Sequence, residues 1–323
     1  MKKCIFLMAS LLLFFSCKEE NETEEKVAEV QVEKVTIERF DKLFFESKPE
    51  DLARLKQQFP FLFPSGNTDA VWQARMNDPF LRKLYEEVQK KYPSLQSLDS
   101  DMENLFRHIK YYYPNFKTPR VITIVNDDNS LKSVYQDNLV IIPLSLYLGK
   151  DNYLYEGLPK YQVQEYEPSQ VVPDVVAAFT MGRIPAPKDN TLLGEMIYHG
   201  KELYLKDMLI PDDADAHKIG YTKEQMEWSR INEAEIWRYF VDRKLLYATD
   251  HKLFDRFIKP APFSKFYLEL DNESPGRIGQ WIGWQIVRSY AENNKNVPLQ
   301  QLLAMDAKAL FDKSKYKPKN DVE

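Results

Sequence analysis

The stretch Ser274–Val287 reads Ser-Pro-Gly-Arg-Ile-Gly-Gln-Trp-Ile-Gly-Trp-Gln-Ile-Val. Ser274 and Pro275 predict the start of a helix, because serine caps a helix well and proline suits its first turn. Three glycines fall on one face of that predicted helix, namely Gly276, Gly279 and Gly283. Glycine inside a helix costs about 1 kcal/mol relative to alanine. Three of them on one face therefore predict a close backbone approach, by another helix of the same domain or by a ligand or partner chain.

Three larger side chains of the same stretch, Arg277, Trp281 and Trp284, would flank this contact. Burial in the core is the alternative for the two tryptophans, because an indole ring buries a large apolar area. The stretch is thus predicted either to pack inside the domain or to line a groove.

A second predicted helix follows Thr191 and carries Glu195 and His199 four positions apart, so that both side chains lie on one face. A zinc metallopeptidase places two histidines at this spacing, and a glutamate after the first serves as general base toward the metal-bound water. Here Glu195 stands in place of the first histidine and Met196 in place of the base. The helix is therefore predicted to be structural, with a vestigial or structural metal site and a working peptidase centre as alternatives.

A third helix is predicted over residues 222–245, because a threonine followed three residues later by glutamine forms a capping box. It carries Glu233 and Glu235, whose side chains point to different faces because they are two positions apart. At most one of them could supply a third metal ligand, and solvated helix carboxylates are the alternative. The sequence thus predicts no cofactor, with a vestigial zinc site at Glu195, His199 and one of these glutamates as the open alternative.

The part of the chain before these helices changes from helical to extended patterns. Residues 38–113 predict helices interrupted by prolines, including one that starts at Pro79 and one over residues 99–112. Two β-branched runs, Val121–Val125 and Asn138–Ile142, predict strands of a small sheet. The predicted fold is therefore α+β and mainly α-helical, with a small β-sheet near residues 120–143 and a helical C-terminal half.

The first seventeen residues carry an export signal. A short basic start and an apolar run lead to Phe15-Ser16-Cys17, which has the form of a lipobox. We therefore predict a signal peptide over residues 1–16 and a mature chain whose acylated Cys17, with palmitate among its acyl groups, is held in a lipid bilayer. An uncleaved N-terminal anchor is the alternative. Residues 17–35 are polar and predict a tether, and residues 36–318 predict a single globular domain.

Composition narrows the classes of function. The formal net charge is −5 and no basic stripe opposes it, so nucleic acid is not expected as a partner. The two cysteines are Cys4 and Cys17, so the domain has no thiol for a disulfide, a nucleophile or a metal ligand. The remaining histidines, His108, His217 and His251, are predicted to be structural or at the surface.

Together these segments resemble the gliding-motility lipoprotein GldB family of Bacteroidetes over nearly the whole chain. The resemblance is carried by the lipobox and by four segments in order: Thr191–Lys201, Asn232–Trp237, Ala261–Ser264 and Ser274–Val287. It implies a cell-envelope lipoprotein required for gliding, a process tied to a dedicated protein-secretion machine. The family in turn is distantly similar to predicted zinc-dependent proteases, which implies a zincin-like outline. Glu195 and Met196 depart from the protease pattern.

The residues and the resemblance predict a membrane-anchored lipoprotein of the cell envelope that faces the periplasm. It would be a pseudo-metallopeptidase that acts as a non-catalytic accessory or scaffold component beside other gliding-machinery proteins. Two alternatives stay open: an active zinc metallopeptidase of the cell envelope, and a module that binds glycan or cell-wall peptide through aromatic rings. The run Lys18-Glu19-Glu20 resembles a signal that sends some Bacteroidetes lipoproteins to the cell surface, with a solvated spacer as its alternative.

Overall fold

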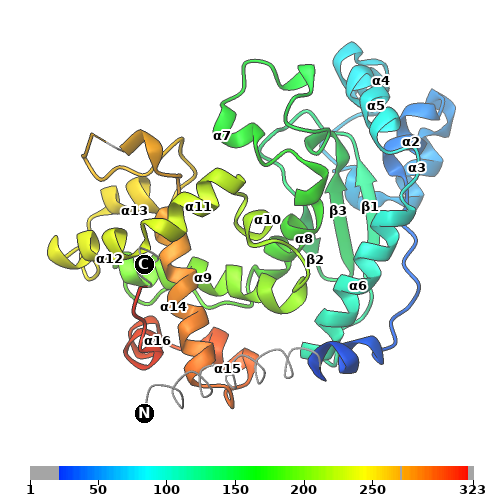
Figure 1. The fold of residues 1–323 in the computed structure, drawn as a ribbon. Helices are drawn as coiled ribbons and strands as arrows, with labels where there is room; N and C mark the ends of the chain where they lie inside the picture. Colours follow the sequence, from blue (N-terminus) through cyan, green and yellow to red (C-terminus); the bar gives the residue numbers. More distant parts are fainter. Residues whose placement is uncertain (1–21, 270, 319–323) are drawn as a thin grey trace.

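Helices make up most of the chain in the computed structural model, which describes residues 22–269 and 271–318 (Figure 1). The predicted signal peptide and Cys17 lie outside the described residues. In the N-terminal half the helices are α2 (Phe40–Glu46), α3 (Leu52–Gln58), α4 (Asp69–Asn77), α5 (Pro79–Lys91), α6 (Gln96–Tyr112), α7 (Lys160–Val163) and α8 (Val171–Thr180). In the C-terminal half they are α9 (Leu192–Leu209), α10 (Asp215–Ile219), α11 (Lys223–Ile231), α12 (Glu233–Asp242), α13 (His251–Phe257), α14 (Ile278–Asn293), α15 (Leu299–Ala304) and α16 (Ala307–Ser314).

Three short strands form one mixed sheet in the order β1-β3-β2. They are β1 (Arg120–Ile124), β2 (Val134–Gln136) and β3 (Leu139–Pro143). β1 pairs with β3 in parallel and β2 pairs with β3 antiparallel. The β-branched residues Val121–Thr123 of β1 and Val140 and Ile142 of β3 are buried, and side chains of this kind favour extended backbone. The prediction of a mainly helical α+β fold with a small sheet is confirmed, whereas β2 is too short to give a pattern of its own.

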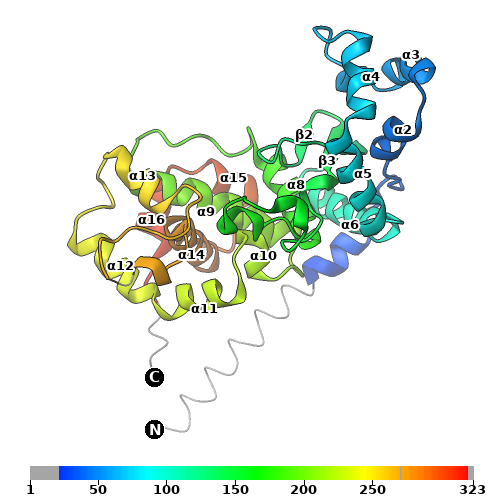
Figure 2. The same ribbon diagram turned by 90° about the horizontal axis from the view of Figure 1, so that it is seen from above.

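The C-terminal half is built on the pair of helices α9 and α14, which lie side by side (Figures 1 and 2). A Cβ atom on Gly283 would stand 1.7 Å from the carbonyl oxygen of Met196, and one on Gly200 would stand 2.3 Å from the carbonyl carbon of Gly283. The two backbones are therefore in direct contact, and only glycine fits at the crossing. The close approach predicted from the glycines of α14 is made by another helix of the same domain.

The start of α14 differs from the prediction. The helix begins at Ile278, and Ser274 is not its cap: its hydroxyl donates to the carbonyl oxygen of Asp271 (2.7 Å) and accepts the N–H of Ser264 (3.1 Å). Gly276 lies before the helix, where a Cβ would meet the carbonyl oxygen of Ala261 at 2.2 Å. The turn over residues 274–277 thus serves packing against the preceding loop, so the three glycines do not share one helical face.

The predicted helix over residues 222–245 is two helices, α11 and α12. Thr222 caps α11 in the expected capping box. The side-chain amide of Asn232 then donates to the carbonyl oxygen of Trp228 (2.8 Å), and the backbone leaves the helical region at this residue. An asparagine that bonds locally to the backbone competes with the helix, which accounts for the break.

The described part of the predicted tether packs against the domain. Residues 22–28 are helical and Val27 is buried. The carboxylate of Glu24 lies 3.2 Å from Nε2 of the buried His108 on α6, and Lys110 donates to the carbonyl oxygen of Gln31 (2.6 Å). The packed structure therefore starts before residue 36, and His108 has the structural position that was predicted for it.

One hydrophobic core joins the sheet, α6, α8 and the α9–α14 pair, and extends along the chain from Val35 to Leu310. Both views place α3 and α4 at the edge of the molecule opposite α12 and α13 (Figures 1 and 2). Within the described residues no helix is long and apolar enough to cross a membrane.

Candidate functional site

The face of α9 that carries Glu195 lies at the rim of a small pocket. Thr191 caps the helix, since its hydroxyl accepts the N–H of Gly194 (3.0 Å). Glu195 then lines a pocket of about 200 Å³ together with Asp250 and His251 from the start of α13. Burial raises the pKa of Glu195, and His199 opposes that shift in part. The structure thus brings one predicted site residue together with His251.

His199 is engaged within its own helix. Its Nδ1 lies 2.6 Å from Oε2 of Glu202, one turn further along α9. This contact holds the imidazole ring along the helix surface. A carboxylate that binds a histidine nitrogen in this way can orient the ring toward a metal ion. A complete metal site would need further ligands besides this histidine.

Met196 occupies the position at which a metallopeptidase of the His-Glu-x-x-His type carries its general base. The side chain of Met196 is 0% exposed, and its carbonyl oxygen contacts the Gly283 backbone of α14. This part of α9 therefore faces the helix crossing and no open site. A base at this position would be buried between two backbones.

The glutamates of α12 have partners away from α9. Glu233 is buried and accepts the hydroxyl proton of Tyr316 (2.8 Å). Burial raises the pKa of Tyr316, and the contact with Glu233 raises it further. Glu235 is exposed and pairs with Arg238 at 2.7 Å. Across residues 22–269 and 271–318, no three histidine, cysteine, aspartate or glutamate side chains gather in a way that could hold a metal ion. The structure therefore does not gather Glu195, His199, Glu233 and Glu235 into one group of possible metal ligands.

A cluster of charged side chains lies at the junction of the two halves of the chain, with Glu165 and Asp174 buried and Arg277 and Lys132 partly exposed. Arg277, directly before α14, places a guanidinium nitrogen 2.6 Å from Oε1 of Glu165, which follows α7. Lys132, before β2, lies 2.7 Å from the other carboxylate oxygen of Glu165 and 3.2 Å from Asp174 on α8. Tyr147 donates its hydroxyl proton to Asp174 (2.9 Å). The cluster thus joins segments that are far apart in sequence.

Electrostatics within this cluster favour the ionised carboxylate. Burial by itself would raise the pKa of Glu165, but Arg277 and Lys132 outweigh it and hold the pKa below its usual value. Lys206 on α9 is buried beside the cluster and donates to the carbonyl oxygen of Lys218 (2.6 Å). Burial lowers the pKa of Lys206 to about 8. A paired carboxylate and a buried lysine of this kind occur both in active sites and in structural ion networks.

A second ionic group fixes α10 against α9 and α14. Arg288 binds Asp207 through two nitrogens, at 2.7 and 2.8 Å, and Asp215 through two nitrogens at the same distances. Trp284 donates its ring N–H to Asp207 (2.8 Å), and Lys218 lies 3.1 Å from the same carboxylate. Trp284, which was a candidate groove residue, is therefore buried in the core and hydrogen-bonded to a carboxylate. Trp281 is also buried.

Comparison with known proteins identifies the family. The family model for gliding motility protein GldB matches residues 20–318. The chain belongs to the GldB family. Its role therefore lies in gliding motility, and the lipoprotein name of the family indicates a protein associated with the cell envelope. No curated protein and no solved structure matches the chain. The zincin-like outline thus stays a prediction.

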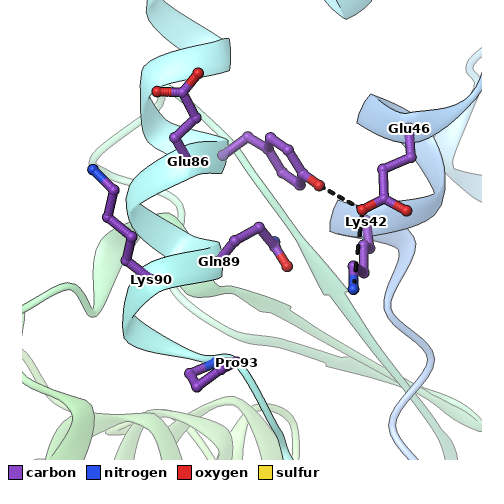
Figure 3. A pocket seen from close by; sticks show the side chains of 7 residues that line it. Lys42, Glu46, Glu86, Gln89, Lys90 and Pro93 are labelled. Carbon is purple, nitrogen blue, oxygen red and sulfur yellow. Dashed lines mark hydrogen bonds and ion pairs between the residues drawn. The ribbon is translucent and has the colours of Figure 1, made fainter.

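Another surface hollow of this GldB-family chain lies between α2 and α5 (Figure 3). It is an open groove of about 580 Å³, lined by Lys42, Glu46, Tyr85, Glu86, Gln89, Lys90 and Pro93. The hydroxyl of Tyr85 donates to the carboxylate of Glu46 across the groove (2.8 Å). The ring of Tyr85 stacks on Phe45 behind it, so one of its faces is already covered.

Most of the charged cluster gives no signal in the sequence. Arg277 stands out because it lies among the glycines before α14. Glu165 and Asp174 resemble ordinary surface acids in the sequence, and Arg277, the partner of Glu165, is far along the chain. Buried charges are paired as a rule. Only knowledge of which acids are buried could therefore have found them.

Proposed function

We propose that this GldB-family chain is a lipid-anchored, non-catalytic accessory component of the gliding and secretion apparatus. It is held in the cell envelope by acylated Cys17, faces the periplasm and binds other proteins of that apparatus. The observation that carries the non-catalytic part is the burial of Met196 against the backbone of α14.

The chemistry of zinc hydrolases explains why a buried methionine at this position argues against catalysis. Such an enzyme needs a carboxylate beside the metal-bound water to take its proton. The equivalent position in α9 carries a thioether, and it lies within the contact between two helix backbones. The two residues that do lie on the accessible side of α9, Glu195 and His199, belong to no group of three histidine, cysteine, aspartate or glutamate side chains of the described chain that could hold a metal ion. This arrangement supports a packing role for α9 and not a hydrolytic one.

A double variant tests the proposal. Glu195→Gln with His199→Ala removes the side chains of α9 that were predicted to serve a metal, and we expect cells that produce it at normal abundance to glide at the speed of the parent. In contrast, Cys17→Ser should release the protein from membranes and stop gliding while the thermal unfolding midpoint stays the same. Loss of gliding in the double variant, at unchanged abundance and unfolding midpoint, would favour the metallopeptidase.

A further inference from the structure

The loop between α13 and α14 turns two large apolar side chains outward. Tyr267 is 73% exposed and Leu268 is 56% exposed. Phe266, directly before them, is buried against the rings of Tyr239 and Phe257. The chain therefore passes from core to solvent within one residue. Isolated exposed apolar side chains are ordinary, whereas two neighbouring ones on a fixed turn suggest a contact surface.

The shape of this turn is fixed by Asp271. Its carboxylate accepts three consecutive backbone N–H groups, from Phe266 (3.0 Å), Tyr267 (2.8 Å) and Leu268 (3.1 Å). These bonds hold Tyr267 at φ +63°, a region that a bulky residue seldom adopts. Strained backbone of this kind persists where the surrounding structure enforces it, and it is frequent at binding sites. These bonds thus fix the backbone of residues 266–268.

One cation lies beside the exposed ring, and a second lies two residues before it in the chain. The guanidinium carbon of Arg256 is 4.4 Å from the ring centroid of Tyr267, and its Nε donates to the carbonyl oxygen of Lys265 (2.7 Å). Lys265 itself is exposed. Within residues 22–269 and 271–318, neither cation forms an ion pair with a carboxylate. Arg256 also donates to the hydroxyl of Tyr239 (3.1 Å) and lies over the ring of Phe257, so Lys265 is the cation that is available to an anionic partner.

We propose that Lys265–Leu268, with Arg256 beneath, form a docking surface, here called the tyrosine tip. Its partner is a protein with an apolar pocket and carboxylates on the rim of that pocket. Tyrosine and arginine supply much of the binding energy in protein interfaces. A surface that is ordered in advance also loses less entropy on binding. A protein fits this tip better than an anionic membrane does, because Glu269 and Asp271 lie close to Lys265 in the chain. A protein pocket can place its carboxylates next to Lys265 and away from these two acids, whereas a uniformly anionic membrane surface repels them.

Photo-crosslinking in gliding cells tests the tip on the full chain. Benzoylphenylalanine at position 268, in place of Leu268, should give one discrete protein adduct on irradiation. Tyr267→Asn removes the ring, and asparagine tolerates positive φ, so the turn should persist. We expect it to lower the adduct yield at least about tenfold, as loss of an interface hot spot does. Lys265→Glu should lower the yield as well, whereas Lys252→Glu on α13 should not.

The controls separate docking from folding and from the wider role. Benzoylphenylalanine at the exposed Tyr247 should give no such adduct, and both tip variants should keep the thermal unfolding midpoint of the parent. No adduct at position 268, or a yield unchanged by Tyr267→Asn and Lys265→Glu, would overturn the tip. So would binding to phosphatidylglycerol vesicles that is lost in Tyr267→Asn. The inference rests on the proposed accessory role in gliding, and gliding speed tests that role separately from the crosslink. A tip variant that loses the adduct but glides normally would contradict the accessory role, while the docking of a protein at the tip would still stand.

Discussion

Gly283 shows how a single missing methyl group sets the distance between two helices. A Cβ at this position would overlap the carbonyl oxygen of Met196 at 1.7 Å, and that atom belongs to helix backbone that cannot rotate away. We expect Gly283→Ala to lower the free energy of unfolding by ~3 kcal/mol or more, because forced overpacking separates the helices. Urea denaturation measures this. Gly66→Ala is the control, since nothing lies within 4 Å of a Cβ there. Equal stability of the two variants would contradict the contact.

Lys206 predicts a pH dependence whose sign follows from its burial. Burial lowers its pKa to about 8 in the folded chain, from the ordinary 10.5. Between these values the unfolded chain binds more protons than the folded one, so the free energy of unfolding rises with pH in this range. Lys206→Met removes a buried charge. It should therefore stabilise the fold at pH 7 by about 1 to 2 kcal/mol, after allowing for the lost hydrogen bond to Lys218.

Urea denaturation between pH 7 and pH 10 checks this expectation. The variant should show a smaller rise in stability above pH 8 than the parent. Some rise should remain, because burial also lowers the pKa of Lys201 to about 8. Lys252→Met, at an exposed position, should leave both the stability and its pH dependence unchanged. A Lys206→Met variant that is less stable than the parent at pH 7 would show that the attraction of Asp174 outweighs the cost of burial.

The residues of the chain differ in how far their roles could be predicted. Glycines in a helix carry a signal, because their cost demands a compensating contact, and Gly283 was correctly predicted to be a point of close approach. Glu195 and His199 share a helical face as predicted, since that follows from spacing alone. The position of Glu165 depends on a contact with Arg277 across the molecule, which no local pattern encodes.

The ion pair between Glu165 and Arg277 links the turn after α7 to the start of α14. Removing one partner of a buried pair leaves the other uncompensated and costs about 3 to 5 kcal/mol. We expect about 3 kcal/mol for Arg277→Met, because Lys132 still faces Glu165. In the Arg277→Met background, Glu165→Gln should lower the free energy of unfolding by less than it does in the parent. The difference, which is the coupling energy of the two side chains, should be about 1 to 3 kcal/mol.

A double-variant cycle by urea denaturation measures that coupling. The exposed pair of Glu235 and Arg238 is the matched control, because its side chains are solvated and its coupling should stay below about 0.5 kcal/mol. If the changes in the free energy of unfolding at Glu165 and Arg277 simply add, the two side chains contribute independently and their ion pair does not link the two segments.

Element boundaries were predicted well where the signal is local. The helices predicted from Pro79, after Thr191 and from residue 222 begin at or next to those positions, where Asp78, Thr191 and Thr222 each accept a backbone N–H of the helix that follows. Boundaries set by tertiary contacts were not found. Ser274 bonds a neighbouring loop instead of capping α14, and Asn232 ends α11 through its own side chain. Serine and asparagine suit both roles, so the sequence alone does not decide between them.

For the molecule as a whole, the packing of its first described segment changes how far from a membrane an anchor at Cys17 would hold the domain. The sequence predicts a tether over residues 17–35, long enough to hold the domain well away from a bilayer. In the structure the chain is already docked at Glu24 and Val27, beside His108 on α6. The short connection from Cys17 to Glu22 reaches at most about 18 Å when fully extended. An acyl anchor at Cys17 would thus keep this side of the domain close to the membrane.

Lengthening that short connection tests whether closeness to the membrane matters. About twenty glycine and serine residues inserted after Asn21 would raise the typical reach to about 25 to 30 Å, because such linkers behave as flexible coils. We expect the protein to remain in the membrane fraction with an unchanged unfolding midpoint, while gliding speed falls by at least about half, since the domain would no longer be held near membrane-bound partners. The same insertion after Pro318 lengthens the chain without moving the domain, and it should leave gliding intact. If cells with the insertion after Asn21 glide at full speed, the anchor serves only to retain the protein, and the docked segment at Glu24 is a matter of stability alone.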